Sequence, residues 1–451
     1  MSGRLIVVSN RIPTEAQPSG GLVVALHDCL TTEGGVWIGT SGTPVEKPEP
    51  KLREIARGDY TRMVFDISPS EQEGYYLGYA NSVLWPLFHR RADLVHLRPD
   101  YADNYLAVNA RLADMLAEFA GPDDLLWIHD YHFLPLAKLL RDRGVSCRIG
   151  FFLHIPFPVV ADILALPQAN DLKDWVAAYD VFGVQTKGDV GRVMAHYRDD
   201  PHAIFDTQGH MVALNNGAAP RHFPIGIDAR EFASLAQTHE ADISLALTLG
   251  QKLVLGVDRL DYSKGLVHRF EGFAAYLDAR KPDTPKATLL QIAPPSREDV
   301  DAYRDIRTEL EQTAGTINGA HSELDWTPIR YIRRAVDRDM LAGVYRRADV
   351  AMVTPLADGM NLVAKEFVAA QNPENPGVLI LSHFAGAAEQ LTDALMVNPY
   401  DTAEVGAAVE QALTMPRSER QDRHAALFDN VMREDISWWT QSYLSALRGT
   451  S

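Results

Sequence analysis

The chain has 451 residues, of which 46% are hydrophobic and 23% charged, and its formal net charge is -17. This length exceeds what one hydrophobic core usually supports, so we expect two domains. The composition is that of a globular protein and excludes a largely disordered chain. The negative charge argues against a nucleic-acid or anionic-membrane partner, because both require basic surfaces.

The two cysteines, Cys29 and Cys147, are too few for a disulfide framework or a cysteine zinc site, and we expect both to be buried, reduced thiols. The first apolar run, Leu5–Val8, is far too short for a secretory signal or a membrane span. No later apolar run reaches spanning length. These features predict a soluble, cytoplasmic protein.

Short apolar runs alternate with longer amphipathic stretches along the whole chain. The runs predicted as buried strands are Leu5–Val8, Leu125–Ile128, Ile149–Leu153, Val181–Val184, Leu253–Val257, Leu289–Ile292, Val350–Val353 and Val378–Leu381. Helices are predicted between them, for example at Val267–Ala279 and Val300–Thr313. Apolar strands separated by helices indicate parallel sheets covered on both faces, so we predict an α/β fold with two doubly wound, Rossmann-like domains.

Turn signals at residues 223–228 are followed by a helical stretch and then by the second series of strands. We therefore predict an N-terminal domain over residues 1–235 and a C-terminal domain over residues 236–435. The last segment, Ile436–Leu447, reads as an amphipathic helix, which either packs back on the first domain or caps the second.

Polar residues recur where the predicted strands end, which is where open parallel sheets bind ligands. In the first half of the chain, the residues that follow strands are Arg11, the block His129–His132 and His154. In the second half, they are the block Asp258–Gly265, Arg297 and the segment Thr354–Asn361. Guanidinium groups bind phosphate bidentately, so the arginines suit phosphorylated ligands. Together these strand ends predict a site in a cleft between the two domains.

The pair Gly20-Gly21 precedes a helical run, Leu22–Leu30, and either approaches a phosphate at the start of that helix or forms an ordinary turn. The chain contains no G-x-G, so the dinucleotide fingerprint and the P-loop are both missing.

The segment Asp358–Glu366 is the most distinctive local feature, because Asp358-Gly359 breaks the chain after a strand and a helix is predicted to start near Asn361. A helix end contributes only about 0.3–2 kcal/mol to anion binding, so Arg259 and Lys264 would have to supply most of the positive charge. Glu366 could accept hydrogen bonds from ribose hydroxyls or could be a solvated helix residue.

For other candidate residues, both a role in the site and a purely structural role remain open. His154 is either a site residue or a satisfied loop histidine, and Tyr76 and Trp85 are either site residues or core aromatics. Asp130 lies between two histidines, but no second acidic cluster accompanies it, so we expect no metal.

Over nearly its whole length, the chain resembles the trehalose-6-phosphate synthase family, which is the retaining GT-B glycosyltransferase family 20. The motifs that carry the resemblance are Ser9-Asn10-Arg11, Trp85-Pro86, His129–His132, His154–Pro158, Asp258–Gly265, Ser296-Arg297 and Asp358–Glu366. The resemblance implies the GT-B fold and transfer of glucose from UDP-glucose to glucose 6-phosphate with retention of configuration. It also implies that no cofactor or metal is required.

The resemblance further implies roles for individual residues. Glucose 6-phosphate would be bound by Arg11, Tyr76, Trp85, Asp130 and Arg297. The nucleotide sugar would be bound by Gly21, His154, Arg259, Lys264, Asp358, Gly359, Met360, Asn361, Leu362, Val363 and Glu366. Of these, the catalytic residues would be Asp130, His154, Arg259 and Lys264, of which the last two would stabilise the departing diphosphate.

Two features qualify the resemblance. In the segment Trp37–Gly42, expected to be a loop near the acceptor, Thr40 replaces a tryptophan that is common in the family. No D-x-D-G-T motif of the phosphatase fused to some relatives occurs, so a separate phosphatase is expected to act on the product.

Two alternatives stay open. One is a related retaining transferase that uses ADP- or GDP-glucose or another phosphorylated acceptor. The other is an inactive sugar-phosphate sensor, which the charged residues at the predicted site disfavour. Oligomeric state is left undecided, with a homo-oligomer as one possibility.

Overall fold

The computed structural model describes residues 3–13, 21–215, 217–244, 252–281, 284, 286–297 and 300–449. Its internal contacts divide the chain into two compact units, which are described separately below. Unit 1 consists of Met1–Pro224 and Ser437–Ser451, and unit 2 of Ile225–Ile436. The sequence had predicted the boundary at residue 235. The division instead precedes helix α9 (Ala229–Ser244), because α9 packs on helices α12 and α13 of unit 2.

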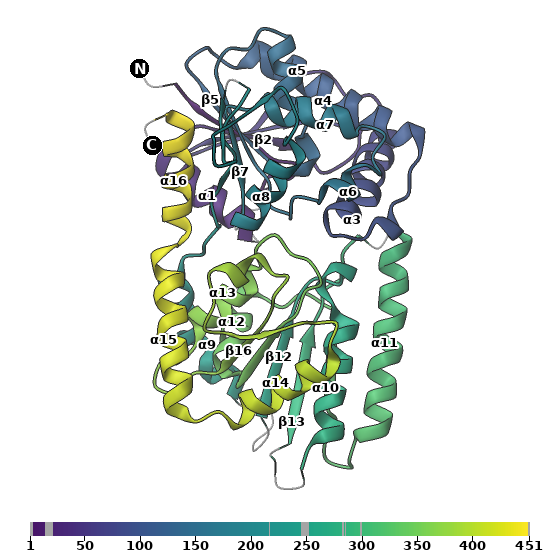
Figure 1. Ribbon diagram of the computed structural model, residues 1–451, viewed down its shortest axis with the longest axis vertical. Coiled ribbons are helices and arrows are strands. Elements are labelled where there is room, and N and C mark those ends of the chain that lie inside the picture. The colour runs from purple at the N-terminus through teal and green to yellow at the C-terminus, as the bar shows by residue number, and fades with distance from the viewer. Residues whose placement is uncertain are drawn as a thin grey trace. The chain divides into compact units, whose positions relative to one another are not determined.

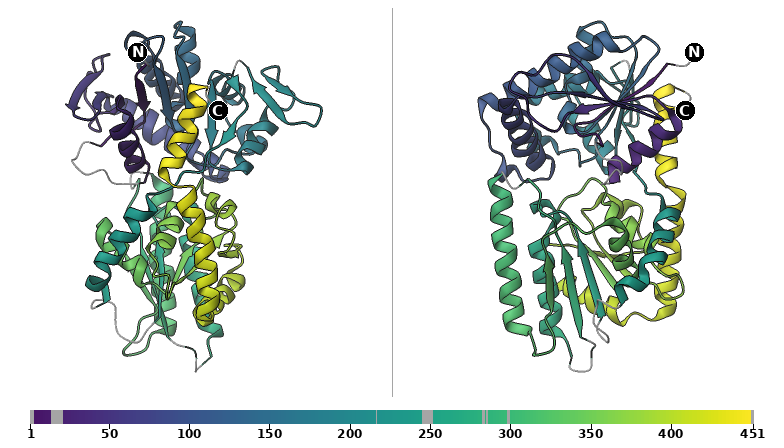
Figure 2. Two further views of the ribbon diagram at one scale, coloured as in Figure 1. Left: turned by 90° about the vertical axis from the view of Figure 1, so that its left-hand side faces the viewer. Right: turned by 180° about the vertical axis from the view of Figure 1, so that it is seen from behind.

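Unit 1 is built on a sheet with the strand order β11-β7-β6-β5-β1-β2-β4-β3, in which only β3 runs antiparallel to its neighbour. The strands are β1 (Leu5–Val8), β2 (Val36–Thr40), β3 (Arg53–Arg57), β4 (Thr61–Phe65), β5 (Leu125–His129), β6 (Arg148–Phe152), β7 (Val181–Val184) and β11 (Arg221–His222). A separate small sheet contains β8 (Ala203–Phe205), β9 (Met211–Leu214) and β10 (Gly217–Ala218), and it lies at the edge of unit 1 (Figure 2).

The helices of unit 1 comprise those that lie between its strands in the chain and the C-terminal helix α16. They are α1 (Gly21–Glu33), α2 (Pro69–Glu71), α3 (Trp85–Phe88), α4 (Pro99–Phe119), α5 (Leu136–Asp142), α6 (Val160–Ile163), α7 (Ala169–Ala177), α8 (Lys187–His196) and α16 (Ile436–Arg448). A π-helix, η1 (Gln72–Leu84), lies between α2 and α3, and short 3₁₀ turns occur at η2 (Ala92–Leu94) and η3 (Tyr131–Phe133).

Helix α16 lies against the sheet of unit 1 (Figure 2), which decides between the two positions left open by the sequence. The Tyr443 hydroxyl donates to the carbonyl of Phe151 over 2.9 Å, and its ring stacks on Trp127 with centroids 4.6 Å apart. A Cβ atom on Gly150 would come within 2.5 Å of that hydroxyl, so the strand needs glycine where the helix docks.

Unit 2 is built on a second sheet, which is entirely parallel, with the strand order β14-β13-β12-β15-β16-β17 (Figure 1). The strands are β12 (Lys252–Val257), β13 (Ala287–Ile292), β14 (Ile329–Ile332), β15 (Val350–Val353), β16 (Val378–Ser382) and β17 (Leu395–Val397). In this order β12 and β15 are neighbours at the centre of the sheet.

Helices cover both faces of the second sheet (Figure 1). Helices α10 (Leu266–Ala279), α11 (Asp301–His321) and α14 (Thr402–Thr414) pack on one face and share one apolar core with it. On the other face lie α9, α12 (Arg338–Arg347), α13 (Leu362–Ala370) and α15 (Arg417–Arg433). Two 3₁₀ turns, η4 (Tyr262–Lys264) and η5 (Gly386–Glu389), follow strand ends.

The α/β fold with two Rossmann-like parallel sheets is confirmed, and all eight predicted strands are present within two residues of their expected bounds. The expectation of a loop at Trp37–Gly42 is wrong for Trp37–Thr40. Residues up to Thr40 form β2, because they pair with β1 and β4 on both sides. Cys29 and Cys147 are buried free thiols, as expected. Among the described residues, no helix has the length and apolar character needed to cross a membrane.

Candidate functional site

Arg11 and Tyr76 form a contact at the end of strand β1. Arg11 is exposed, and its Nη2 donates to the Tyr76 hydroxyl over 2.8 Å, with the guanidinium 5.6 Å from the ring centroid. Tyr76 in turn stacks on His132, with centroids 5.9 Å apart and planes 12° apart. The structure therefore brings together two of the residues predicted to bind the phosphate of the acceptor.

The segment that carries Arg11 is held from the protein interior. The buried Tyr75 hydroxyl donates to Oδ1 of Asn10 over 2.8 Å, and the buried Thr40 hydroxyl donates to the Asn10 carbonyl over 2.7 Å. Thr40 thus contacts the backbone next to Arg11.

Tyr76 and Trp85 are presented by the π-helix η1 and the helix that follows it. In a π-helix each carbonyl is met by a donor five residues later, and here the Asn81 side-chain amide also donates to the Tyr76 carbonyl over 2.8 Å. Asn81 is itself fixed by the Tyr131 hydroxyl, which donates to its Oδ1 over 2.9 Å. Trp85 is 5% exposed and packs on His89 and Tyr131, so it is a core aromatic as well as a site candidate.

Asp130 and His154 meet beyond the ends of the neighbouring strands β5 and β6. Asp130 has φ 72° and ψ 164°, a backbone conformation that a residue with a side chain rarely adopts. Its Oδ1 accepts a 3.3 Å hydrogen bond from the His154 backbone amide. Strain of this kind persists only where the surroundings enforce it, which makes Asp130 a strong site candidate.

His154 forms a pair with His129, the last residue of β5. Nε2 of His154 lies 3.0 Å from Nδ1 of His129. Desolvation lowers the pKa of His154 to about 3 and, together with the neighbouring His154, lowers that of His129 well below its ordinary value. Both imidazoles are therefore neutral at physiological pH.

Gly21 is the first residue of helix α1, so the predicted helix after the glycine pair is confirmed. Its partner Gly20 lies outside the described residues. The predicted approach of this turn to a phosphate therefore stays a prediction.

In unit 2, Lys264 and Asp358 come together from the ends of β12 and β15. Lys264 Nζ lies 2.6 Å from Asp358 Oδ2, and both side chains are largely buried. The Asn361 side-chain amide donates to the same carboxylate oxygen over 3.0 Å. The ammonium group is thus held at a fixed point beyond the carboxyl ends of these two central strands.

Close backbone packing supports the position of Lys264. Gly265 has φ 64°, and a Cβ atom there would come within 2.5 Å of the Thr354 carbonyl. The two strand-end segments can approach this closely only because residue 265 is glycine.

Helix α13 begins at Leu362 with Asn361 as its N-cap, which confirms the predicted start. Asn361 has φ 88°, and its Oδ1 accepts the Ala364 amide over 3.2 Å. The first amides of a helix have no partner within it, which leaves those of Leu362 and Val363 directed away from the helix. The preceding turn is fixed by the Ala387 amide, which donates to the Met360 carbonyl over 2.7 Å, and Gly359 lies buried beside it.

Glu366 lies in the second turn of α13 and is partly exposed. The Tyr345 hydroxyl donates to its Oε2 over 3.3 Å. Desolvation raises the pKa of Glu366 to about 7. Its carboxyl therefore changes charge near neutral pH.

The two arginines predicted in unit 2 differ in how they are held. Arg259 is exposed just beyond β12. Arg297 follows β13 at φ 48°, and its Nη1 donates to the Tyr303 hydroxyl over 2.6 Å and lies 3.4 Å from Oδ2 of the buried Asp261. Arg297 is therefore built into unit 2, whereas Arg11 and Tyr76 belong to unit 1.

Sequence reasoning missed the residues that hold these side chains in place, namely Tyr75, Asn81, His129, Asp261, Tyr303 and Tyr345. Asp261 and His129 fall inside blocks that were singled out. His129 ends β5 and Asp261 lies in the segment that follows β12, and these positions were an available signal. Tyr303 and Tyr345 lie on α11 and α12, outside the motifs, and no local signal identifies them.

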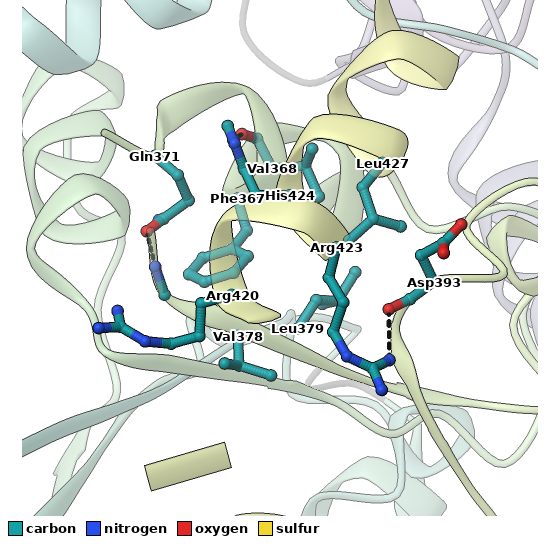
Figure 3. A pocket seen from close by; sticks show the side chains of 11 residues that line it. Phe367, Val368, Gln371, Val378, Leu379, Asp393, Arg420, Arg423, His424 and Leu427 are labelled. Carbon is teal, nitrogen blue, oxygen red and sulfur yellow. Dashed lines mark hydrogen bonds between the residues drawn. The ribbon is translucent and has the colours of Figure 1, made fainter. Parts of the chain in front are cut away.

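Two further observations concern possible ligand sites. In the described part of the chain, no three His, Cys, Asp or Glu side chains are grouped closely enough to hold a metal ion. Figure 3 shows a surface pocket in unit 2 of about 300 Å³, which includes the solvent at its mouth and is lined by residues of α13, β16 and α15, among them Phe367, Gln371, Arg420, Arg423 and His424. Gln371 and His424 bond to backbone groups there, so the pocket has few free polar groups for a ligand.

Comparison with known proteins gives consistent results over the full length. The model of glycosyltransferase family 20 matches residues 5–449. The trehalose-6-phosphate synthase of Escherichia coli K12 is 44% identical over 99% of this chain and 95% of its own length.

Solved structures agree with the sequence relatives. An α,α-trehalose-phosphate synthase (UDP-forming) from Burkholderia vietnamiensis is 41% identical with a TM-score of 0.95, covering 100% of this chain and 98% of its own. A Burkholderia xenovorans enzyme in complex with glucose 6-phosphate is 42% identical with a TM-score of 0.93, covering 99% of this chain and 100% of its own. A structure from E. coli bound with UDP-2-fluoro glucose is 44% identical with a TM-score of 0.92, covering 99% of both chains.

Both sheets, the strand-end residues and the match over residues 5–449 lead to one conclusion: the chain belongs to glycosyltransferase family 20 and has its GT-B fold.

Proposed function

We propose that this protein is a UDP-forming α,α-trehalose-phosphate synthase, which transfers glucose from UDP-glucose to glucose 6-phosphate with retention of configuration. The observation that carries the proposal is full-length identity of 41–44% to enzymes of this activity. The strand-end clusters around Arg11 and around Lys264 supply the charges that such substrates require.

On the acceptor side, Arg11 and Tyr76 bind the 6-phosphate, with Arg297 as a further phosphate ligand. The guanidinium fork of Arg11 matches phosphate geometry, and its contact with Tyr76 orients it before substrate arrives. Asp130 accepts a sugar hydroxyl, and Trp85 forms an apolar wall beside the ring.

On the donor side, Arg259 and Lys264 bind the diphosphate, and the amides of the segment Asp358–Val363 contact its oxygens and the sugar. Gly21 lets the start of α1 approach the same phosphates, and His154 contacts the transferred glucose. Glu366 accepts hydrogen bonds from the ribose hydroxyls. The residues assigned to each substrate are those that the resemblance to the family implies.

The chemical step requires stabilisation of charge that develops on the leaving diphosphate. Lys264 is suited to this role because its ammonium is held 2.6 Å from Asp358, beyond the carboxyl ends of β12 and β15. The ammonium group therefore need not change position during the reaction. The acceptor hydroxyl attacks the anomeric carbon on the same face from which the diphosphate departs, which explains retention of configuration. An oxygen of the donor phosphate takes the proton of that hydroxyl. No enzyme nucleophile is needed in this scheme.

A donor-by-acceptor panel tests the proposal. UDP-, ADP- and GDP-glucose are combined with glucose 6-phosphate and with other phosphorylated acceptors, and release of nucleoside diphosphate is measured. We expect the highest kcat/KM for UDP-glucose with glucose 6-phosphate and a phosphorylated disaccharide as product. A different optimum would identify the related transferase, and no release with any pair would indicate the inactive sensor.

The proposal includes three expectations from the sequence: the protein works in the cytoplasm, needs no cofactor or metal, and passes its product to a separate phosphatase. Activity that survives dialysis against a chelator of divalent cations would support the second expectation.

Donor binding is expected to weaken as the pH falls through neutrality, because a protonated Glu366 cannot accept both ribose hydroxyls. Since the pKa of this carboxyl is raised to about 7, the carboxylate is the major form above that pH and the acid below it. The KM for UDP-glucose should therefore rise between about pH 8 and about pH 6, approaching tenfold per unit at the acid end.

Glu366→Gln should give a high KM that does not change over this range. Glu374→Gln, at an exposed glutamate of the same unit, is the matched control and should keep the wild-type profile. A wild-type KM that is constant over the range would contradict the role of Glu366.

A further inference from the structure

The two neutral imidazoles of the histidine pair at the ends of β5 and β6 carry two protons on four ring nitrogens, and the contact between them can form in two ways. His129 Nδ1 and His154 Nε2 are 3.0 Å apart, and one of them must donate to the other. If His129 donates, the proton of His154 is on Nδ1. If His154 donates, the proton of His129 is on its Nε2.

The surroundings of His129 distinguish these two tautomers. Its side chain is fully buried, and its Nε2 has no hydrogen-bond partner among the described residues. The ring is enclosed by Trp127 at 4.5 Å and by Phe152 and Trp439 at 6.4 Å between centroids. A proton on Nε2 would be a buried N–H without an acceptor, which is a rare and costly arrangement.

The same aromatic cluster also contains other N–H groups that need an acceptor. The indole Nε1 atoms of Trp127 and Trp439 are buried and, within the described part of the chain, have no hydrogen-bond partner. Indole nitrogen can only donate. A third N–H in this cluster would add to the deficit of acceptors, whereas an unprotonated Nε2 of His129 is itself an acceptor.

His154 differs from His129 in being partly exposed. Its backbone amide is bonded to Asp130 and its Nε2 to His129, while its Nδ1 has no partner in the described part of the chain. This nitrogen is the one that can contact a ligand.

We infer that His129 is a positioning residue for the donor site: it donates its Nδ1 proton to Nε2 of His154 and thereby keeps the proton of His154 on Nδ1, directed to an oxygen of the bound nucleotide sugar. The identity of that ligand depends on the proposed function, but the tautomer does not. The lowered pKa values of both rings agree with the neutral pair that this arrangement requires.

The tautomer can be measured without turnover. Long-range ¹H–¹⁵N spectra of protein labelled at its histidine rings distinguish protonated from unprotonated ring nitrogens, and His154→Gln identifies the signals of residue 154. We expect a protonated Nδ1 and an unprotonated Nε2 at His154. A protonated Nε2 would overturn the inference, whatever the activity of the protein.

Kinetics of two variants test the consequence. His129→Phe keeps an aromatic ring but has no donor, and it should lower kcat/KM for UDP-glucose about tenfold to hundredfold, the usual range for one lost buried hydrogen bond, with little change in the KM for glucose 6-phosphate. His129→Asn places an amide N–H where Nδ1 stood and should recover most of the loss.

His424→Phe is the matched control, because His424 is also a buried histidine bonded through one ring nitrogen, over 3.0 Å to the Val368 carbonyl. It should leave kcat/KM for UDP-glucose and the KM for glucose 6-phosphate within about threefold of wild type, a smaller change than the loss of kcat/KM expected for His129→Phe. Unchanged kinetics of His129→Phe would count against the inference. Where that variant does not fold, the wild-type spectrum decides. Absence of UDP release by the wild-type protein would instead refute the proposed function.

Discussion

Lys264→Ala is expected to lower kcat by about 10²–10³-fold, the range found when one preorganised group that stabilises transition-state charge is removed. The KM for glucose 6-phosphate should change little, because the charge acts on the leaving diphosphate. The largely buried ammonium is held 2.6 Å from Asp358 and cannot be replaced by water at the same point. Steady-state kinetics with each substrate varied in turn measures both constants.

The matched control is Lys252→Ala, at the opposite end of the same strand β12. Lys252 Nζ lies 2.8 Å from Asp349 Oδ1, so this variant also breaks a lysine–aspartate pair of unit 2. It should keep kcat near the wild-type value. If Lys264→Ala changed only the KM for glucose 6-phosphate, or if both variants lost activity equally, the assignment of Lys264 to the leaving group would be wrong.

The buried central strands could be predicted from the sequence because their signal is local. Val350–Val353 and Val181–Val184 are runs of four apolar residues bounded by polar ones, and the structure places strands at the same residues. Strand β3 (Arg53–Arg57) lies at the edge of its sheet and is mostly exposed, so it has no apolar run to detect. The π-helix η1 is equally invisible, since its pattern of apolar residues does not differ from that of an ordinary helix.

The candidate site was predictable to the extent that its residues follow strands. Asp130 and His154 follow neighbouring strands of the first sheet, and Lys264 and Asp358 follow neighbouring strands of the second. Within each parallel sheet, the carboxyl ends of neighbouring strands lie side by side. The residues that orient them were not predictable. Tyr303 reaches Arg297 and Asp261 from helix α11, and such a contact depends on how the helix packs on the sheet.

Arg11→Ala is expected to lower kcat/KM for glucose 6-phosphate by about 10²-fold. Each hydrogen bond to a charged group contributes about 1.5–3 kcal/mol, and about 1.4 kcal/mol corresponds to a factor of ten. Two bonds from one guanidinium would give more, but Arg11 is exposed and solvent screening reduces the effect. Raising the ionic strength should accordingly weaken the wild-type preference for the phosphorylated acceptor.

Unphosphorylated glucose as acceptor makes this prediction specific. Because Arg11 acts on the phosphate, Arg11→Ala should leave the slow reaction with glucose almost unchanged and so erase most of the discrimination between the two acceptors. Arg98→Ala is the matched control, since Arg98 also lies over a tyrosine ring, 4.9 Å from the centroid of Tyr101, and is exposed. Equal losses with both acceptors would mean that Arg11 supports the structure of the site and does not bind the phosphate.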